Sequence, residues 1–287
     1  MFTGMPRPDA RTTWSETLAG TRFTDVRWVD ETASTNADAL AMARSGDPEG
    51  IVVVADHQTA GRGRRGRTWS APPGASLLWS VLLRPPAAVM EATTMAVAVA
   101  VAEAVDEVAG VAAGLKWPND LVLPGADGGL DRKLGGILAE ADWPAGSDVA
   151  AGYRRPSPRQ RVVVVVGIGL NVNWPVDLPE ELADSATALN HVTGRPVDRE
   201  ELLVAILRRL DRHYGALAAG DRAVVFDAWR ERSATLGRRV RVDLGPDDVE
   251  GTAVDVTDDG HLVVETDEGG RRTFAVGDVV HLRPLAS

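Results

Sequence analysis

The 287 residues suffice for one large domain and a small one, and the 44% of apolar residues allow a complete hydrophobic core. A formal net charge of -10 argues against general binding to nucleic acids or membrane surfaces. Cysteine is absent, which excludes disulfides and thiolate catalysis, and no apolar run approaches the roughly 20 residues of a membrane span. The segment 1–20 lacks the apolar centre of a signal peptide, so we expect a cytoplasmic protein.

The chain starts with a segment of no clear periodicity, residues 1–22, which we expect to be a loose arm. A strand is predicted at 23–29 and a helix at 37–44, which Gly46 ends.

Ser34, Thr35 and Asn36 precede this helix. Thr35 with Asp38 three positions later fits an N-cap pair, and capping alone is the commoner role for such residues. The alternative is that their hydroxyl and amide groups, together with the helix N-terminus, face a small anion or amide. The sequence leaves both interpretations open.

An arginine- and glycine-rich run, residues 61–67, follows an apolar strand predicted at 51–55. It contains four arginines, three glycines and no acid, with Gln58 before it and Trp69 after it. Glycine lets a backbone lie close to a ligand, and guanidinium groups bind carboxylate or phosphate through paired hydrogen bonds. The run predicts either a mobile lid over an anionic ligand or a solvated loop, which is about as common for such a stretch taken alone.

Two further interpretations of this run are weaker. A nucleic-acid patch conflicts with the acidic total of the chain. Gly61, Gly63 and Gly66 match the spacing of a dinucleotide-binding turn, but that turn passes directly from a strand into a helix. Here Pro72 and Pro73 follow the run, and no acid occurs about 20 residues farther on, which disfavours a dinucleotide site.

Polar residues recur near glycines in the middle of the chain, between a buried helix predicted at 91–109 and a strand predicted at 162–173. Residues 115–121 gather lysine, asparagine and aspartate around a proline, which predicts an interrupted strand with exposed polar side chains. Lys133 then opens a strand with a glycine pair at 135–136, where another group can approach the backbone closely.

Lysine, glutamine and asparagine are scarce in this chain, and several of the few that occur lie in these segments. Only two of the 31 basic residues are lysines, Lys116 and Lys133, and the chain has two glutamines and five asparagines. A genome biased toward arginine and alanine codons explains the scarcity, and a lysine or amide that persists under such a bias is more often needed. Asn171 and Asn173, two apart, would share one face of a strand or close a turn.

The last part of the chain begins with an exposed connection predicted at 153–161 and two helices, one capped by Asp198 and one at 222–232. Short strands separated by Asp-Gly and Gly-Gly turns then predict a small antiparallel barrel, to which we assign no chemistry. The expected organisation is an arm at 1–22, a large domain at 23–235 and a small β-domain at 236–287.

The candidate site residues are cations and amides rather than nucleophiles. The chain has no Gly-Lys-Ser/Thr phosphate loop and no serine in a nucleophile elbow. Fixed cations suit a reaction that joins a carboxylate to a nucleotide α-phosphate, because they lower the repulsion between the two anions. The product of such a reaction, an acyl adenylate, hydrolyses readily, and a closing loop would exclude water from it.

Together these motifs resemble those of the biotin protein ligase family. The resemblance extends from the first predicted strand to the end of the chain and rests on Ser34-Thr35-Asn36, Gln58, 61–67, Trp69, 116–120, 132–138 and 169–171. It implies an α+β fold, with a class II synthetase-like mixed sheet and helices followed by a small C-terminal SH3-like β-barrel. It also implies a two-step reaction. Biotin and MgATP give biotinyl-5′-AMP and pyrophosphate, and a lysine of a biotin carboxyl carrier domain of an acyl-CoA carboxylase then takes the biotinyl group.

The resemblance further implies a role for each matching residue. Lys133 would be the main catalytic cation, Arg64 would belong to the closing loop, and Asp120 would assist Mg²⁺ or the incoming lysine. Mg²⁺ itself would be held by the phosphates, and Lys116 would play a supporting part. The residues implied to hold biotin and its adenylate are Ser34, Thr35, Asn36, Gln58, Arg62, Gly63, Arg64 and Lys133. The residues implied to meet ATP are Arg67, Trp69, Asn119 and Asn171.

Two alternatives to biotin ligation stay open. One is a ligase that attaches lipoate or a related acid to a carrier by the same chemistry. The other is a nucleic-acid-binding regulator, although only 33 residues precede Ser34, fewer than the winged-helix domain of bifunctional family members needs. We therefore expect no nucleic-acid or membrane partner, and a monomer or weak homodimer.

Overall fold

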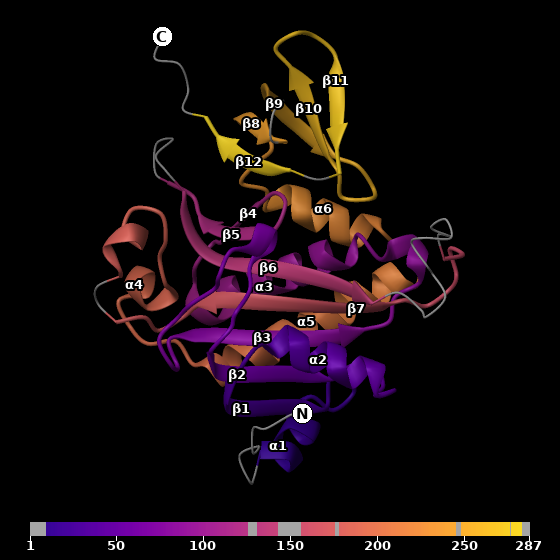
Figure 1. Cartoon of the computed structure of the whole chain (residues 1–287), viewed down its shortest axis with the longest axis vertical. Helices are drawn as coiled ribbons and strands as arrows, with labels where there is room; N and C mark the ends of the chain where they lie inside the picture. Colours follow the sequence, from indigo (N-terminus) through magenta and orange to yellow (C-terminus); the bar gives the residue numbers. More distant parts are fainter. Residues whose placement is uncertain are drawn as a thin grey trace.

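The computed structural model describes residues 10–125, 131–142, 156–175, 178–244, 248–275 and 277–282. A seven-stranded sheet with helices and a five-stranded antiparallel sheet follow one another along the chain (Figure 1). This arrangement confirms the predicted α+β class. Within the described ranges, no helix combines the length and apolarity needed to cross a membrane.

The large sheet has the strand order β1-β2-β3-β7-β6-β5-β4. Only β1 and β2 pair in parallel, and α2 (Thr35–Arg44) forms the crossover that a parallel pair requires. All other neighbours pair antiparallel. The strands are β1 (Val26–Thr32), β2 (Val52–Gln58), β3 (Ser76–Leu83), β4 (Gly114–Lys116), β5 (Asp120–Leu123), β6 (Arg132–Asp142) and β7 (Val163–Asn171).

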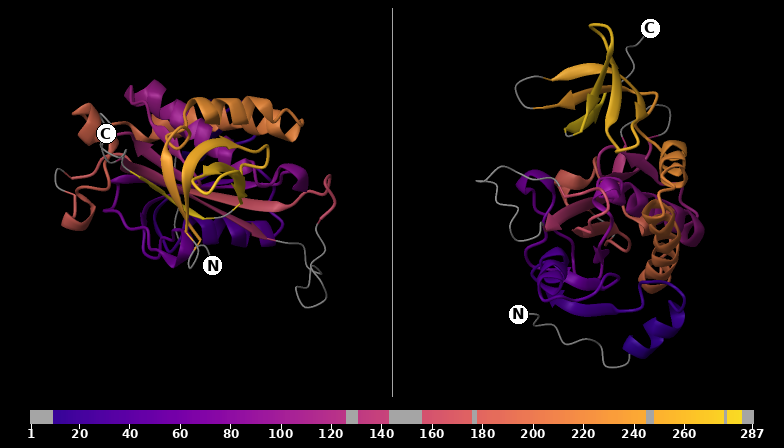
Figure 2. Two further views of the ribbon diagram at one scale, coloured as in Figure 1. Left: turned by 90° about the horizontal axis from the view of Figure 1, so that it is seen from above. Right: turned by 90° about the vertical axis from the view of Figure 1, so that its right-hand side faces the viewer.

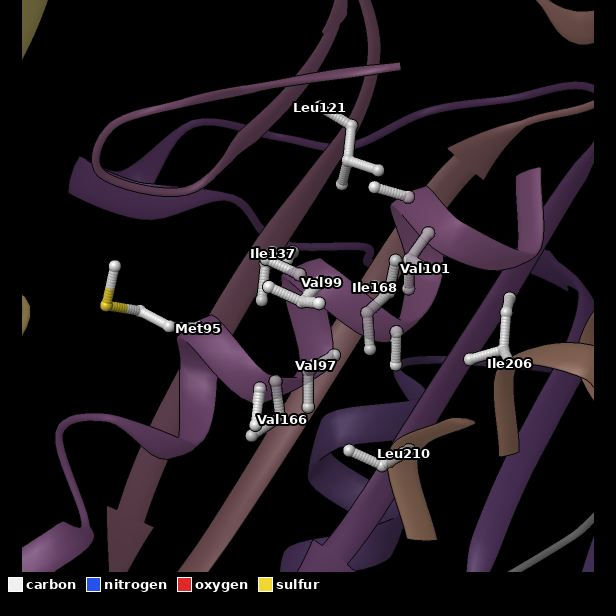
Figure 3. Packing of buried hydrophobic residues seen from close by; sticks show 14 of the residues in the cluster. Met95, Val97, Val99, Val101, Leu121, Ile137, Val166, Ile168, Ile206 and Leu210 are labelled. Carbon is white, nitrogen blue, oxygen red and sulfur yellow. The ribbon is translucent and has the colours of Figure 1, made fainter. Parts of the chain in front are cut away.

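The two faces of this sheet carry different helices, because alternate residues of each strand point to opposite sides. On one face, α3 (Thr93–Ala109) packs with α5 (Arg199–Ala218), and Figure 3 shows α3 side chains meeting Val166 and Ile168 of β7. On the other face, Val165 of the same strand packs with α2. Figure 2 shows α5 and α6 (Ala223–Glu231), both orange, along one side of the molecule.

The predicted helix boundaries hold closely where a capping residue marks them. Gly110 takes a left-handed conformation, φ 66°, directly after α3. The Asp198 carboxylate accepts hydrogen bonds from the backbone N–H groups of Glu200 and Glu201 at the start of α5, which confirms that cap.

Two predicted elements are wrong in form. Residues 10–17 of the expected loose arm form α1 (Ala10–Thr17), because Trp14 and Leu18, four positions apart, bury one side of it and Trp14 stacks on Trp28. Residues 115–121 form a hairpin of β4 and β5 with Lys116 opposite Asp120, rather than one interrupted strand. In the connection expected at 153–161, residues 153–155 lie outside the described residues, and 157–161 are exposed.

The C-terminal unit is a five-stranded antiparallel sheet in the order β11-β10-β9-β8-β12. It agrees with the predicted series of short strands, and the strands β10 and β11 are joined by the expected glycine turn. Its elements are β8 (Arg239–Asp243), β9 (Val249–Val256), β10 (Leu262–Thr266), β11 (Arg271–Phe274) and β12 (Asp278–His281). Short helical elements elsewhere are α4 (Leu189–Thr193), η1 (Arg64–Gly66), η2 (Ala87–Val89) and η5 (Glu180–Leu182).

A largely buried histidine side chain, that of His281 with 10% exposure, joins the two units. His281 Nδ1 lies 2.7 Å from Asp131 Oδ2, and its Nε2 lies 3.2 Å from the Thr235 hydroxyl. Arg238 donates to the same Asp131 carboxylate at 3.1 Å. Burial, followed by the positive charge of Lys116, lowers the pKa of His281 to about 4. The ring is therefore neutral at pH 7, so that Nδ1–H donates to Asp131 and Nε2 accepts the Thr235 hydroxyl proton.

We expect this histidine to make the protein less stable as the pH falls from 6.5 toward 4. The pKa of His281 is lowered in the folded chain. At a pH below 6.5, the ordinary pKa of histidine, this residue therefore binds a proton in the unfolded chain but stays neutral in the folded chain. The free energy of unfolding should fall by at most about 3 kcal/mol across this window. Urea unfolding at pH 7.5 and pH 5 measures the change. His281→Gln should flatten the dependence and His191→Gln should keep it; an equal loss in His281→Gln would contradict the assignment.

Candidate active site

Glycines on β6 and β7 leave room for a cavity beside α2. Gly136 pairs with Gly169, and Gly167 follows on the same face by strand alternation. A Cβ at Gly167 would lie 2.0 Å from Asn36 Oδ1, and one at Gly169 would lie 2.4 Å from the Trp69 ring. The cavity measures about 300 Å³. The close approach predicted from the glycines is confirmed, and the approaching groups are side chains of the chain itself.

Most of the predicted site residues line this one cavity. They are Ser34, Thr35, Asn36, Gln58, Arg62, Gly63, Arg64, Arg67, Trp69, Asn119, Asp120 and Lys133, together with Lys116. Segments separated by up to about a hundred residues in the sequence thus meet at one place.

The start of α2 forms one wall of the cavity. The expected N-cap pair is wrong, because Thr35 is the first residue of α2, Ser34 precedes it, and Asp38 accepts a hydrogen bond from Thr32 instead. Ser34, the N-cap residue, makes no side-chain capping hydrogen bond. The hydroxyl and amide groups are therefore used in tertiary contacts rather than in capping.

A buried hydrogen-bond network fixes these groups. The Thr35 backbone N–H and hydroxyl both donate to Gln58 Oε1, at 2.8 and 3.0 Å. The Ser80 hydroxyl donates to Asn36 Oδ1 at 2.6 Å and lies 2.7 Å from the Thr35 hydroxyl. Since the oxygen of Gln58 is engaged, its amide nitrogen is the end that can donate into the cavity. Such a wall suits a small polar head group with hydrogen-bond acceptors.

Glu140 of β6 was not predicted from the sequence, although it completes this network. Its Oε2 accepts from Asn36 Nδ2 at 2.7 Å and from the Arg62 guanidinium at 3.1 Å. The contact sets the orientation of the Asn36 amide, so that the Asn36 oxygen faces Ser80. One carboxylate therefore links the first arginine of the loop to the wall formed by α2.

A β-bulge turns Lys133 into the cavity. The β5–β6 pairing shifts register at Leu134, which becomes an extra residue buried in the core on the α3 side. Lys133 consequently lies on the same face as Gly136, where a Cβ would sit 3.3 Å from its Nζ. The Lys133 ammonium donates to Asp120 Oδ1 at 2.7 Å and lies 5.7 Å from the centre of the Trp69 ring.

The hairpin of β4 and β5 supplies further polar groups. Asn119 donates through Nδ2 to the Ile137 carbonyl at 2.7 Å and accepts from Arg64 at 3.0 Å. Burial lowers the pKa of Lys116, while the nearby Asp120 carboxylate acts in the opposite direction. The hairpin therefore brings a cation, a carboxylate and an amide to the same edge of the cavity.

The arginine-rich run forms a small hairpin that overlies the cavity. Arg62 bridges Thr68, and the Gly63 N–H donates to the Arg67 carbonyl at 2.7 Å. Trp69 follows the hairpin and lies on the glycine floor. Its indole Nε1 is buried and finds no acceptor among the described residues, so it is available to donate to a group bound in the cavity. This geometry favours the lid over the solvated loop.

The C-terminal unit, to which the sequence assigned no chemistry, contributes to the wall of the cavity. Asp278, Val279 and Val280 of β12 line the cavity. Asp278 accepts a hydrogen bond from Arg67 at 2.8 Å. The sequence of a short terminal strand does not show which part of the large domain it faces, so these residues were missed.

The structure does not bring Asn171 to the cavity with the other predicted residues. This buried amide donates to the Thr187 carbonyl at 3.1 Å, and its oxygen accepts from the Trp174 indole at 3.1 Å. Asn173 likewise bonds the backbone of Val197 through both ends of its amide. These contacts indicate that the two asparagines hold the end of β7 and the chain after it.

The cavity combines five cationic side chains with a neutral amide and hydroxyl wall at α2. The cations are Arg62, Arg64, Arg67, Lys116 and Lys133. Such an arrangement can hold an uncharged polar head at one end and bring two anionic groups together at the other. Among the described residues, no group of three or more His, Cys, Asp or Glu side chains could hold a metal ion.

Family models and related proteins match this chain over most of its length. The biotin/lipoate A/B protein ligase family model matches residues 28–148, and the biotin protein ligase C-terminal domain model matches residues 235–282. The chain is 39% identical to the biotin–[acetyl-CoA-carboxylase] ligase of Mycobacterium tuberculosis, over 92% of each chain. It is 33% identical to the bifunctional ligase/repressor BirA of Bacillus subtilis, over 86% of this chain and 71% of that protein.

The structure is similar to that of the biotin protein ligase from Aquifex aeolicus in complex with biotin and ATP, with a TM-score of 0.71 and 27% identity. The match covers 91% of this chain and all of that chain. The sequence match across nearly the whole length and the shared fold show that this protein belongs to the biotin protein ligase family.

Proposed function

We propose that this protein joins biotin to ATP, giving biotinyl-5′-AMP and pyrophosphate, and then transfers the biotinyl group to a lysine of a biotin carboxyl carrier domain. The observation that carries the proposal is the meeting of Lys133 and the arginine hairpin over one cavity with an amide and hydroxyl wall. The relative from Mycobacterium tuberculosis is named for the same ligation, and the Aquifex aeolicus structure holds biotin and ATP.

The neutral wall suits the ureido head of biotin, which has a carbonyl acceptor and two N–H donors. We assign this head to the Gln58 amide nitrogen and to the side chains of Ser34, Thr35 and Asn36. The biotin carboxylate then points toward Lys133. This orientation separates the uncharged end of the substrate from its reacting end.

Lys133 acts on the first step by neutralising charge. The carboxylate oxygen attacks the α-phosphate, an O–P bond forms, and pyrophosphate leaves with the electrons of the broken P–O bond. The ammonium, held by Asp120 at 2.7 Å, stabilises the negative charge that gathers on the oxygens. Mg²⁺ would enter with the triphosphate and would neutralise phosphate charge, and Asp120 is one of the two carboxylates of the cavity that could hold it.

In the second step the acceptor lysine attacks the acyl carbonyl as a free amine. The C–N bond forms, the C–O bond of the mixed anhydride breaks, and AMP leaves. The ammonium of the acceptor first loses one proton to solvent, and we assign to the Asp120 carboxylate the second proton, which the nitrogen gives up as the C–N bond forms. The hairpin 61–69 keeps water from the adenylate until that step.

A lipoate ligase is the second candidate, because the family model spans biotin and lipoate ligases. The arginine hairpin, together with the match of residues 235–282 to the biotin protein ligase C-terminal domain, favours biotin. A cytoplasmic location, a monomer or weak homodimer, the absence of nucleic-acid partners and the division at residues 22 and 235 stay predictions.

Transfer to a carrier domain tests the proposed function. We expect the carrier to gain the mass of a biotinyl group when the protein, MgATP and biotin are all present, as measured by mass spectrometry. Lipoate in place of biotin should give no product at equal concentration. Lipoyl transfer at a comparable rate, or no transfer with either acid, would contradict the proposal.

Lys133→Ala should reduce biotin-dependent exchange of pyrophosphate into ATP by about 10²- to 10³-fold, the range for loss of one fixed transition-state contact. Lys116→Ala serves as the matched control, and its loss should be about tenfold or less because Lys116 has no assigned contact with the reacting atoms. Thermal unfolding of each variant checks the fold. Equal losses in the two variants would contradict the assignment of Lys133.

Glu140→Gln should raise the KM for biotin by about tenfold and leave the KM for ATP within about twofold, because it frees the Asn36 amide and Arg62 together. Asp142→Asn, on the same strand and paired with Arg44, makes the same change of charge away from the cavity. Steady-state kinetics with each substrate varied measures the split. A parallel rise in both KM values would show that Glu140 has no selective role at the biotin end.

A further inference from the structure

We propose that Asp278, on the C-terminal unit, is a positioning residue that fastens the arginine hairpin over the cavity. The C-terminal unit thereby takes a direct part in retaining the reaction intermediate. This consequence rests on the proposed function, whereas the fastening itself does not.

Three arginines of the hairpin converge on one carboxylate. Asp278 lies 2.8 Å from Arg67 NH2, 3.3 Å from Arg64 NH1 and 3.4 Å from Arg65 NH1. Its side chain is 21% exposed, less than that of any of the three arginines. Ion pairs that share a partly buried carboxylate are screened less by solvent than isolated surface pairs are.

Further contacts hold the same hairpin to the C-terminal unit. Arg65 donates to the Asp243 carbonyl at 3.1 Å, and its guanidinium lies 3.4 Å from the Asp243 carboxylate. Arg64 donates to the Gly277 carbonyl at 3.4 Å. The hairpin is thus attached to both β8 and β12, which are paired neighbours in one sheet.

The backbone of the hairpin is consistent with such an attachment. Arg65 is the only non-glycine residue of the described chain with a positive φ, at 54°. A residue with a Cβ adopts this conformation at a cost, and it persists where surrounding contacts stabilise it. Because the Arg65 side chain reaches Asp243 and Asp278, the contacts of this turn residue are with the C-terminal unit.

The arginines that are attached to Asp278 keep hydrogen-bond donors with which they can bind a further anion. Each guanidinium has five N–H donors, and the Asp278 carboxylate engages only part of those on Arg64, Arg65 and Arg67. Arg64 and Arg67 also line the cavity, whereas Arg65 is directed to the C-terminal unit. The hairpin can therefore remain attached to β12 while two of its arginines face a nucleotide phosphate.

The anchor itself lies on a rigid element. Val279, next to Asp278, is buried in the core, and β12 pairs with β8 along its length. His281, three residues after Asp278, is held by Asp131 of the large domain. A carboxylate on a supported strand positions its partners better than one on a loop. The hairpin is accordingly ordered by contacts with a different part of the chain, 211 residues away.

Hydrogen–deuterium exchange of the protein without added ligand tests the fastening directly. In Asp278→Asn we expect the amides of residues 61–68 to exchange about fivefold faster, the size expected when a modest set of ion pairs is lost. Asp267→Asn, which removes the same charge from a pair with Arg239 on the same unit, should leave these amides unchanged. Asp278→Glu should restore slow exchange. Unchanged exchange in Asp278→Asn, or equal acceleration in Asp267→Asn, would overturn the proposal.

Retention of the adenylate tests the consequence. With preformed biotinyl-5′-AMP, Asp278→Asn should release the adenylate about fivefold faster than the original protein and Asp267→Asn do, seen as labelling of bystander amines. Adding Arg64→Ala should increase the release little further, because both changes break the same attachment. Faster exchange with unchanged release would overturn the retention role alone. Loss of all adenylate formation in the original protein would instead refute the proposed function.

Discussion

The cavity depends on the absence of side chains at three positions of one sheet face. Gly136, Gly167 and Gly169 lie where β6 and β7 would otherwise place Cβ atoms against Asn36 and Trp69. The opposite face of the same strands is filled by α3 and is part of the main core. The sheet is therefore closely packed on one side and hollow on the other. The polar wall at α2 and the position of Trp69 both require this hollow, and so does the path of Lys133 across Gly136.

Charge is distributed around the hollow in a consistent way. Neutral amides and hydroxyls lie at α2, and four of the cavity's cations have a carboxylate partner: Glu140 for Arg62, Asp120 for Lys133 and Asp278 for Arg64 and Arg67. These carboxylates come from β6, β5 and β12, and each holds a cation that lies on a different element from its own. Preorganised cations stabilise developing negative charge without reorientation during the reaction. The acids thus act as positioning groups, and a net positive charge remains for the phosphates.

Much of this arrangement could be predicted from the sequence. The remaining features could not, and the structure shows the reason for each. The motifs around Ser34, Arg64, Asn119 and Lys133 were singled out by a helix start, by glycines and by scarce lysine and amides, and the family resemblance gave them roles; they meet in one cavity. The β-bulge at Leu134, which turns Lys133 into the cavity, could not be predicted, because the alternation of apolar residues along the strand does not reveal it. Glu140 and Asp278 are single acids among 41 in the chain, and only the tertiary fold brings them to the arginines. Asn171 matched a motif, but its amide is used to hold the strand end.

The central claim is that the cavity makes an acyl adenylate and keeps it. Rapid-quench measurement of pyrophosphate, with biotin and MgATP but no carrier domain, tests it most directly. We predict a burst of about one pyrophosphate per chain followed by a much slower phase, because the retained adenylate blocks further turnover. Linear release of pyrophosphate without a burst would show that the adenylate escapes as fast as it forms, and would contradict the account.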